Sequence, residues 1–145
     1  MGIRVIDSLD EIERGTVVIR SHGVRPEVYA ECRRRGLNMV DATCPHVERV
    51  HQLVDRYSED GSPVIVIGEE DHPEVVGIAG WAHGDVYVVP GDQDVERVPR
   101  LSRALAVAQT PTRAARLAAA SPARGRRVEY QTGRGPAAPA ARCRT

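Results

Sequence analysis

Cys44 carries the clearest chemical signal in this sequence. It lies in the run Asp-Ala-Thr-Cys-Pro-His-Val (residues 41–47), after a short apolar stretch and directly before Pro45. Proline favours the first turn of a helix, because its missing N–H would have no partner there. A thiol at a helix N-terminus is stabilised as a thiolate, which is a nucleophile or a metal ligand. A lone cysteine also commonly fills a buried site as a small apolar residue, and that alternative stays open.

Three further junctions, each joining an apolar run to a segment with a nearby proline, carry polar side chains. The candidate site residues at these junctions are His22, His72, Glu74 and Thr110. Imidazole groups and helix N-termini bind anions, and a buried carboxylate can serve as a general acid. Ligands of parallel α/β sheets bind at the carboxyl ends of the strands. We therefore expect these side chains and Cys44 to gather at one edge of one sheet, facing a phosphorylated ligand.

The elements that position these residues alternate along the chain. Apolar periodicity and turn residues predict strands over 16–20, 37–40, 63–68, 86–89 and 104–108, helices over 26–35, 45–60 and 73–80, and a helical turn over 92–98. Alternating strands and helices are typical of βαβ units with a parallel sheet. The predicted fold is therefore α/β, a single three-layer module with a mostly parallel sheet flanked by helices.

Composition divides the chain at about residue 111. Residues 1–98 hold 19 acidic residues and 10 arginines, whereas residues 99–145 hold one acidic residue and 10 arginines. Residues 112–145 are rich in arginine, alanine and proline and lack apolar periodicity, so they cannot bury enough surface to order a fold. We expect an α/β module over 1–111, followed by a low-complexity basic tail over 112–145 that is disordered or is read from a shifted frame.

The cysteine count and the apolar runs limit the class of protein. Three cysteines without framework spacing are not typical of a secreted disulfide scaffold. No apolar run approaches the roughly 18 residues of a membrane span, and the polar N-terminal segment does not resemble a signal peptide. We therefore expect a cytoplasmic protein without membrane contact.

Four segments together carry a family resemblance. They are Ile-Arg-Ser-His-Gly-Val at 19–24, Asp-Ala-Thr-Cys-Pro at 41–45, Val-Ile-Gly at 66–68 with His-Pro-Glu-Val-Val-Gly at 72–77, and Ala-Gln-Thr at 108–110. In order and spacing, residues 12–111 resemble the central third of the IspH (LytB) family. Members are 4-hydroxy-3-methylbut-2-enyl diphosphate reductases of the non-mevalonate isoprenoid pathway. The resemblance implies three α/β modules around a 4Fe–4S cluster, and products that are isopentenyl and dimethylallyl diphosphate.

The resemblance also implies a role for each candidate residue. Cys44 resembles one of three cysteines that ligate the cluster, and His22 and His72 resemble the histidines that hold the substrate diphosphate. Glu74 resembles the carboxylate that gives a proton to the departing hydroxyl, and Thr110 resembles the threonine that supports this relay and the substrate. The family further implies a ferredoxin or flavodoxin as electron donor.

The chain also departs from the family pattern. The family's first and last modules, with the other two cluster cysteines, have no counterpart in the sequence. Cys143 lies in the basic tail without the family's surrounding motif, and Pro111 stands where the family has a second threonine. Clusters of this type need several thiolates, which Cys44 alone does not supply. We therefore expect a fragment of the reductase that is inactive by itself.

Two other classes of function remain as alternatives. The module could bind a phosphate-bearing ligand without catalysis. The arginine-rich tail could contact nucleic acid or acidic partners, and this hypothesis is the weakest because the tail has almost no aromatic platform and no recognised fold. His46 and His51 are predicted to lie on the solvated surface, because their spacing of five does not suit one ligand face. Cys32 is predicted to lie in the core.

Overall fold

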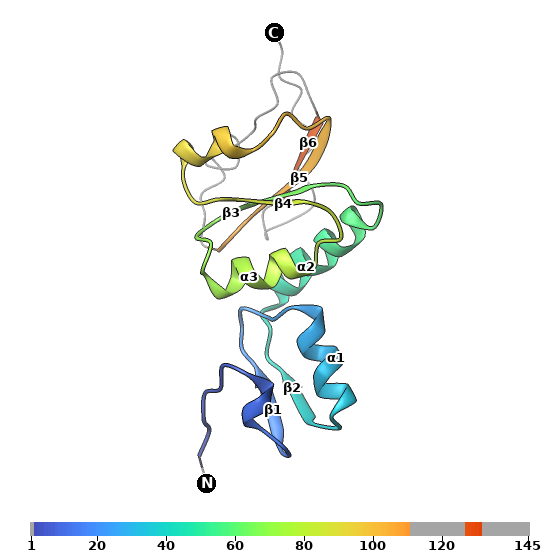
Figure 1. Cartoon of the computed structure of the whole chain (residues 1–145), viewed down its shortest axis with the longest axis vertical. Coiled ribbons are helices and arrows are strands. Elements are labelled where there is room, and N and C mark those ends of the chain that lie inside the picture. The colour runs from blue at the N-terminus through green and yellow to red at the C-terminus, as the bar shows by residue number, and fades with distance from the viewer. Residues whose placement is uncertain (1, 111–126, 132–145) are drawn as a thin grey trace.

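A computed structural model describes residues 2–110 and 127–131 of the chain, and helices and strands alternate along it (Figure 1). The elements are η1 (Leu9–Glu11), β1 (Thr16–Ile19), α1 (Pro26–Arg34), β2 (Asn38–Asp41), α2 (Pro45–Ser58), β3 (Val64–Ile67), α3 (Pro73–Gly80), β4 (Val86–Val89), η2 (Asp92–Arg97), β5 (Arg103–Ala108) and β6 (Arg127–Gln131). The two η elements are 3₁₀ helices. The predicted strands and helices are confirmed to within two residues at each end. None of the helices in the described ranges is long and apolar enough to span a bilayer.

The strands form two parallel sheets. β1 pairs with β2 in one sheet, and the other has the strand order β4-β3-β5-β6. In the larger sheet Val64 lies opposite both Val86 and Leu105, so β3 is a central strand. The α/β class with parallel sheets flanked by helices is confirmed, whereas the expectation of one continuous sheet is corrected. An apolar strand pattern indicates that a strand is buried but does not specify which strand it pairs with.

The central strand β3 of the four-stranded sheet is buried on both faces, as its continuous apolar run predicts. Val64 and Val66 face α2 and α3, while Ile65 and Ile67 face η2 and the segment that follows it. Each of these four side chains is at most 4% exposed, and burying one stabilises the fold by about 2 kcal/mol. Figure 1 shows α2 and α3 on one side of this sheet and η2 on the other.

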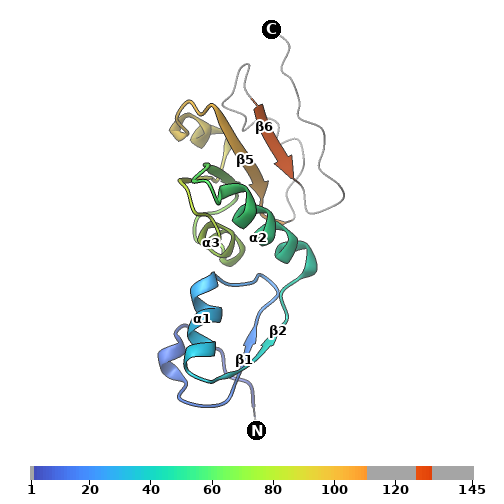
Figure 2. The same ribbon diagram turned by 90° about the vertical axis from the view of Figure 1, so that its right-hand side faces the viewer.

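The smaller sheet is covered on one face only. Val17 and Ile19 of β1 pack with Cys32 of α1, which confirms the prediction that this cysteine lies in the core. On the opposite face Val18 and Val40 are each about half exposed. Figure 2 shows that β1, β2 and α1 form a unit beside the larger sheet, with α2 and α3 lying between the two.

All three α-helices begin with a proline, as the sequence predicts. Pro26, Pro45 and Pro73 each occupy the first helical position, where the missing N–H has no cost. The residue directly before α2 is Cys44, and the residue directly before α3 is His72. Two of the candidate residues therefore lie at helix N-termini.

Part of the predicted tail belongs to the larger sheet. Residues 127–131 form β6, which pairs in parallel with β5 and places Arg127 opposite Arg103. This strand lies inside the segment predicted to be disordered, so that prediction does not hold for these five positions. The remaining positions of the 112–145 segment lie outside the described residues, as does Cys143.

Candidate functional site

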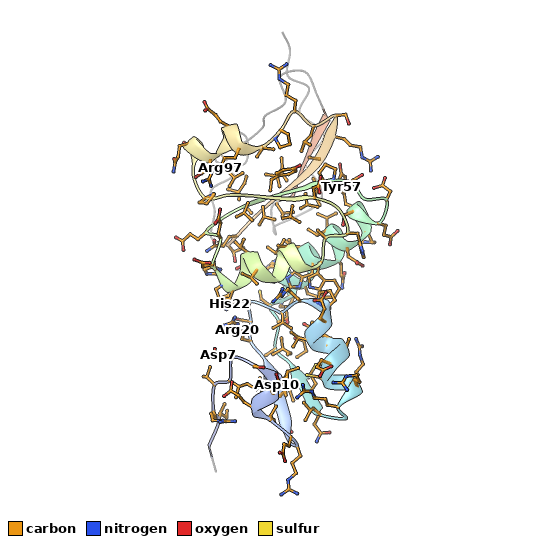
Figure 3. The ribbon with its side chains drawn as sticks, in the orientation of Figure 1. Asp7, Asp10, Arg20, His22, Tyr57 and Arg97 are labelled. Carbon is orange, nitrogen blue, oxygen red and sulfur yellow. The ribbon has the colours of Figure 1, made fainter. Side chains whose placement is uncertain are left out.

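Two histidines from the two different sheets meet at the centre of the candidate site. His22 lies in the turn after β1, and His72 lies at the start of α3 after β3. Their ring centroids are 5.4 Å apart and the rings are perpendicular. Figure 3 shows His22 at the boundary between the smaller sheet and α3. The predicted gathering of these two imidazoles is therefore found, although it occurs between two sheets and not at one edge.

The backbone of α3 determines which nitrogen of His72 carries the proton. The N–H of Glu74 donates to Nδ1 of His72 at 3.1 Å, so the imidazole acts as the N-cap of the helix. A nitrogen that accepts a hydrogen bond is unprotonated, and the neutral ring then carries its proton on Nε2. His72 can therefore donate one hydrogen bond to an anion through Nε2 without breaking its cap. On His22, Nδ1 is buried and has no hydrogen-bond partner among the described residues.

Glu74 and Thr110 form the second part of the site. Glu74 is 3% exposed, and the N–H of Thr110 donates to its Oε1 at 2.9 Å. The Thr110 hydroxyl lies 3.0 Å from Oε1 and 2.9 Å from Oε2, and it can donate to either oxygen. This contact follows from strand order, because β3 and β5 are neighbours and Ile67 lies opposite Ala108. The segments that leave these two strands therefore meet beyond the sheet.

Cys44 lies beside the turn that carries His22. Its N–H donates to the carbonyl of Ser21 at 2.9 Å, and its own carbonyl accepts from the N–H of Glu48 in the first turn of α2. The thiol belongs to a half-buried residue. Among the described residues, no group of three or more histidine, cysteine or acidic side chains is arranged to hold a metal ion. The role of Cys44 as a cluster ligand stays a prediction.

His51 is the residue that the sequence analysis placed wrongly. It is 2% exposed, not solvated, and its ring stacks on Trp81 with centroids 5.4 Å apart and planes at 20°. Burial lowers the pKa of His51 to about 4, and the nearby Asp41 carboxylate only partly opposes this. The signal was present in the sequence, because His51 follows Val47 by four positions and precedes Val54 by three, and so lies on the buried stripe of α2.

Gln109 was also missed as a residue that shapes the site. Its side-chain Oε1 accepts the N–H of Glu69 at 3.0 Å, which ties the end of β5 to the loop before His72. A Cβ on Gly68 would lie only 2.6 Å from that oxygen, so glycine is needed there. The acidic run at 69–71 is exposed, in agreement with its predicted position in a solvated loop. The position of Gln109 next to Thr110 was the available signal.

Comparison with known families identifies the family of this chain. The family model described as LytB protein matches residues 1–131. The chain belongs to the LytB family. This confirms the resemblance seen in the sequence and extends it beyond residue 111 as far as β6.

Curated relatives and solved structures agree with the assignment to the LytB family. The 4-hydroxy-3-methylbut-2-enyl diphosphate reductase of Geobacter sulfurreducens is 46% identical over 110 residues, which are 76% of this chain and 39% of that protein. The enzyme of the same name from Alkaliphilus oremlandii is 40% identical over 109 residues. The chain thus spans about 39% of the length of the curated relatives it matches.

The solved structure of E-1-hydroxy-2-methyl-but-2-enyl-4-diphosphate reductase from Plasmodium falciparum superposes with a TM-score of 0.71 at 26% identity, covering 78% of this chain and 36% of that one. A structure of (E)-4-hydroxy-3-methyl-but-2-enyl diphosphate reductase superposes with a TM-score of 0.61 at 40% identity, covering 68% of this chain and 36% of the other. Both structural neighbours therefore match the α/β fold of the LytB chain over about a third of their own length.

Proposed function

We propose that this chain supplies the diphosphate-binding and proton-delivering part of a 4-hydroxy-3-methylbut-2-enyl diphosphate reductase. The observation that carries the proposal is the contact between His22 and His72, with the carboxylate of Glu74 two positions after His72 and bonded to Thr110. The reaction is the reductive removal of the substrate hydroxyl to give isopentenyl and dimethylallyl diphosphate. Family membership and the names of the relatives support the substrate class.

The two histidines suit a diphosphate. Phosphate oxygens accept hydrogen bonds from imidazole N–H groups, and the N-terminus of α3 adds its positive end. His72 offers its Nε2 proton because Nδ1 is engaged by the N–H of Glu74. In our proposal His72 and His22 bind neighbouring oxygens of the ligand.

Glu74 and Thr110 suit the proton transfer. Loss of the hydroxyl as water consumes two electrons and two protons, with one proton going to the departing oxygen and one to the carbon skeleton. Glu74 is buried, and the Thr110 hydroxyl lies within hydrogen-bond distance of both its carboxylate oxygens. A proton can therefore pass between the carboxyl group and a ligand oxygen through one hydroxyl.

The residues of the described ranges do not fit a 4Fe–4S cluster by themselves. Of the two cysteines that the structure describes, Cys44 lies next to the His22 turn and Cys32 is buried in the core of the smaller sheet. Such clusters are held by several cysteine thiolates. In our proposal the remaining ligands lie outside the described residues or on another polypeptide, and the chain alone is inactive. A ferredoxin or flavodoxin donor and a cytoplasmic location complete the proposal through the family resemblance.

A chimera tests the catalytic proposal directly. Residues 1–110 of this chain replace the matched segment of the Geobacter sulfurreducens relative, which restores the flanking parts of the longer protein. We expect the purified chimera to convert the substrate, and we expect Glu74→Gln to abolish turnover while retaining the fold. The matched control is Glu69→Gln, which changes an exposed carboxylate in the loop that precedes α3. An inactive, well-folded chimera, or a Glu74→Gln chimera with full activity, would refute the proposal.

A comparison of the isolated chain with the chimera separates this proposal from a simple phosphate-binding module. Inorganic pyrophosphate is titrated into the full chain while the His22 and His72 ring resonances are followed by NMR. Both proposals predict that the two histidines respond. Only the reductase proposal predicts that anaerobic iron and sulfide reconstitution yields a cluster spectrum in the chimera and none in the isolated chain.

A further inference from the structure

The turn that carries His22 is held by side chains from the other half of the molecule. Gly23 has a φ of 69°, in the left-handed region, and its N–H donates to the carbonyl of Arg20 at 2.9 Å. A Cβ on Gly23 would lie 2.5 Å from Cε1 of His51. The His51 ring, which belongs to α2, therefore packs directly against the Cα of Gly23, where any larger residue would carry a Cβ.

Trp81 holds the next residue of the same turn. Its indole Nε1–H donates to the carbonyl of Val24 at 3.0 Å, and its ring stacks on His51. The two aromatic rings form one unit, here called the stacked pair, that contacts two consecutive residues after His22. Trp81 is also the C-cap of α3, the helix that begins after His72.

Gly77 of α3 completes this contact. A Cβ at Gly77 would lie 3.4 Å from Nε2 of His51 and 3.5 Å from the carbonyl oxygen of His22. The ring of His51 and the backbone of His22 therefore both approach α3 at Gly77, where the helix has no side chain. His72 is attached to the N-terminus of that short helix, so the same element carries His72 at its start and contacts the His22 turn along its second half, through Gly77 and Trp81.

We propose that His51 and Trp81 are positioning residues that set the distance between the His22 and His72 rings. The two histidines come from different sheets, and strand pairing does not connect those sheets. Their spacing therefore depends on packing between the halves, and the stacked pair, together with Gly77, contacts the His22 turn in that packing. Burial keeps the His51 pKa near 4, so the ring is uncharged at neutral pH and packs as an aromatic surface.

The inference rests on the proposed anion site at His22 and His72, and its test separates the two. In the full chain, His51→Leu and Trp81→Leu each remove the stacking, and His46→Ala is the matched control on the exposed face of α2. The first measurement is the nuclear Overhauser effect between the His22 and His72 rings. The second is the affinity for inorganic pyrophosphate, followed on the same ring resonances.

We expect both leucine variants to lose the nuclear Overhauser effect between the His22 and His72 rings and to bind pyrophosphate about tenfold more weakly. The His72 tautomer should not change, because its cap is local to α3. His46→Ala should behave as wild type. Leucine variants that keep both the wild-type inter-ring effect and the wild-type affinity overturn the inference. If wild type fails to bind pyrophosphate, the anion site is contradicted, while the inter-ring effect still tests the positioning role.

A measurement on the wild-type chain covers the case in which the variants do not fold. Trp81 is the only tryptophan in the sequence, so its indole N–H gives one assignable resonance. That proton is bonded to the carbonyl of Val24 in the His22 turn. Saturation with pyrophosphate should shift it if the stacked pair and the anion site share this turn. An indole resonance that stays unchanged at saturation overturns the inference.

Discussion

Lowering the pH should destabilise this protein through His51. The pKa of the buried ring is about 4 in the folded chain, against 6.5 for an unperturbed histidine. Because the folded pKa is the lower of the two, the unfolded chain binds the proton first as the pH falls. The stabilisation is fully present above about pH 6.5, and it is lost progressively as the pH falls towards 4. The difference corresponds to about 3 kcal/mol of unfolding free energy.

Acidic groups act in a different pH range. The pKa of Glu31 is held at about 2 by hydrogen bonds from Arg34 and Arg35. Its folded pKa is below its ordinary value of 4.5, so its stabilisation is lost only as the pH falls from 4.5 towards 2. The range between 6.5 and 4.5 therefore isolates the effect of His51 from that of Glu31.

Urea unfolding of the full chain measures this effect. Far-UV circular dichroism and the fluorescence of Trp81 report the transition between about pH 7.5 and 3.5. We expect the unfolding free energy of wild type to fall across the His51 range. His51→Gln, which does not titrate there, should show a flat profile between pH 6.5 and 4.5. His46→Gln, changed on the exposed face of α2, should keep the wild-type slope in that range. A slope that survives in His51→Gln would refute the reasoning.

Three further predictions concern the proposed site. Thr110→Val should lower the unfolding free energy by about 2 kcal/mol, because the Glu74 carboxylate loses a hydroxyl donor, and Thr110→Ser should restore it in urea titrations. His72→Ala should cost about 1 kcal/mol through loss of the helix cap, whereas His72→Asn should retain stability. ¹⁵N NMR should find the His72 proton on Nε2. In a Cys143→Ser chain, a thiol reagent should label half-buried Cys44 rapidly and Cys32 slowly, because burial raises the pKa of Cys32; equal labelling rates would contradict this.

Much of the local structure was predictable from residue types. Proline at the first helical position predicted all three α-helices, and polar residues after apolar runs predicted where His72 and Glu74 lie. The contact between Glu74 and Thr110 followed once β3 and β5 were neighbours in one sheet. These features are local, or they depend on a single strand pairing, so patterns in the chain are sufficient to find them.

The position of His51 was predictable in principle but was missed. Its spacing from the other histidine of α2 was considered, while its place on the apolar stripe of that helix was not. A histidine at a stripe position is buried with its neighbours, whatever its polarity, when its ring has an aromatic partner such as Trp81. Strand β6 was missed for another reason, since it is a short run of five residues within a segment rich in arginine, alanine and proline, and it forms by pairing with β5.

The sequence by itself determined the α/β class, the bounds of the helices and of strands β1 to β5, the family, and which residue types stand at the ends of those strands. Only the tertiary structure decided that the strands divide between two sheets and that His22 meets His72 across them. The physical reason is that periodicity reports which face of an element is buried, whereas the partner of that face is chosen by packing between distant segments. In this chain the packing against the His22 turn includes the ring of His51, the ring of Trp81 and the backbone of Gly23, which has no Cβ.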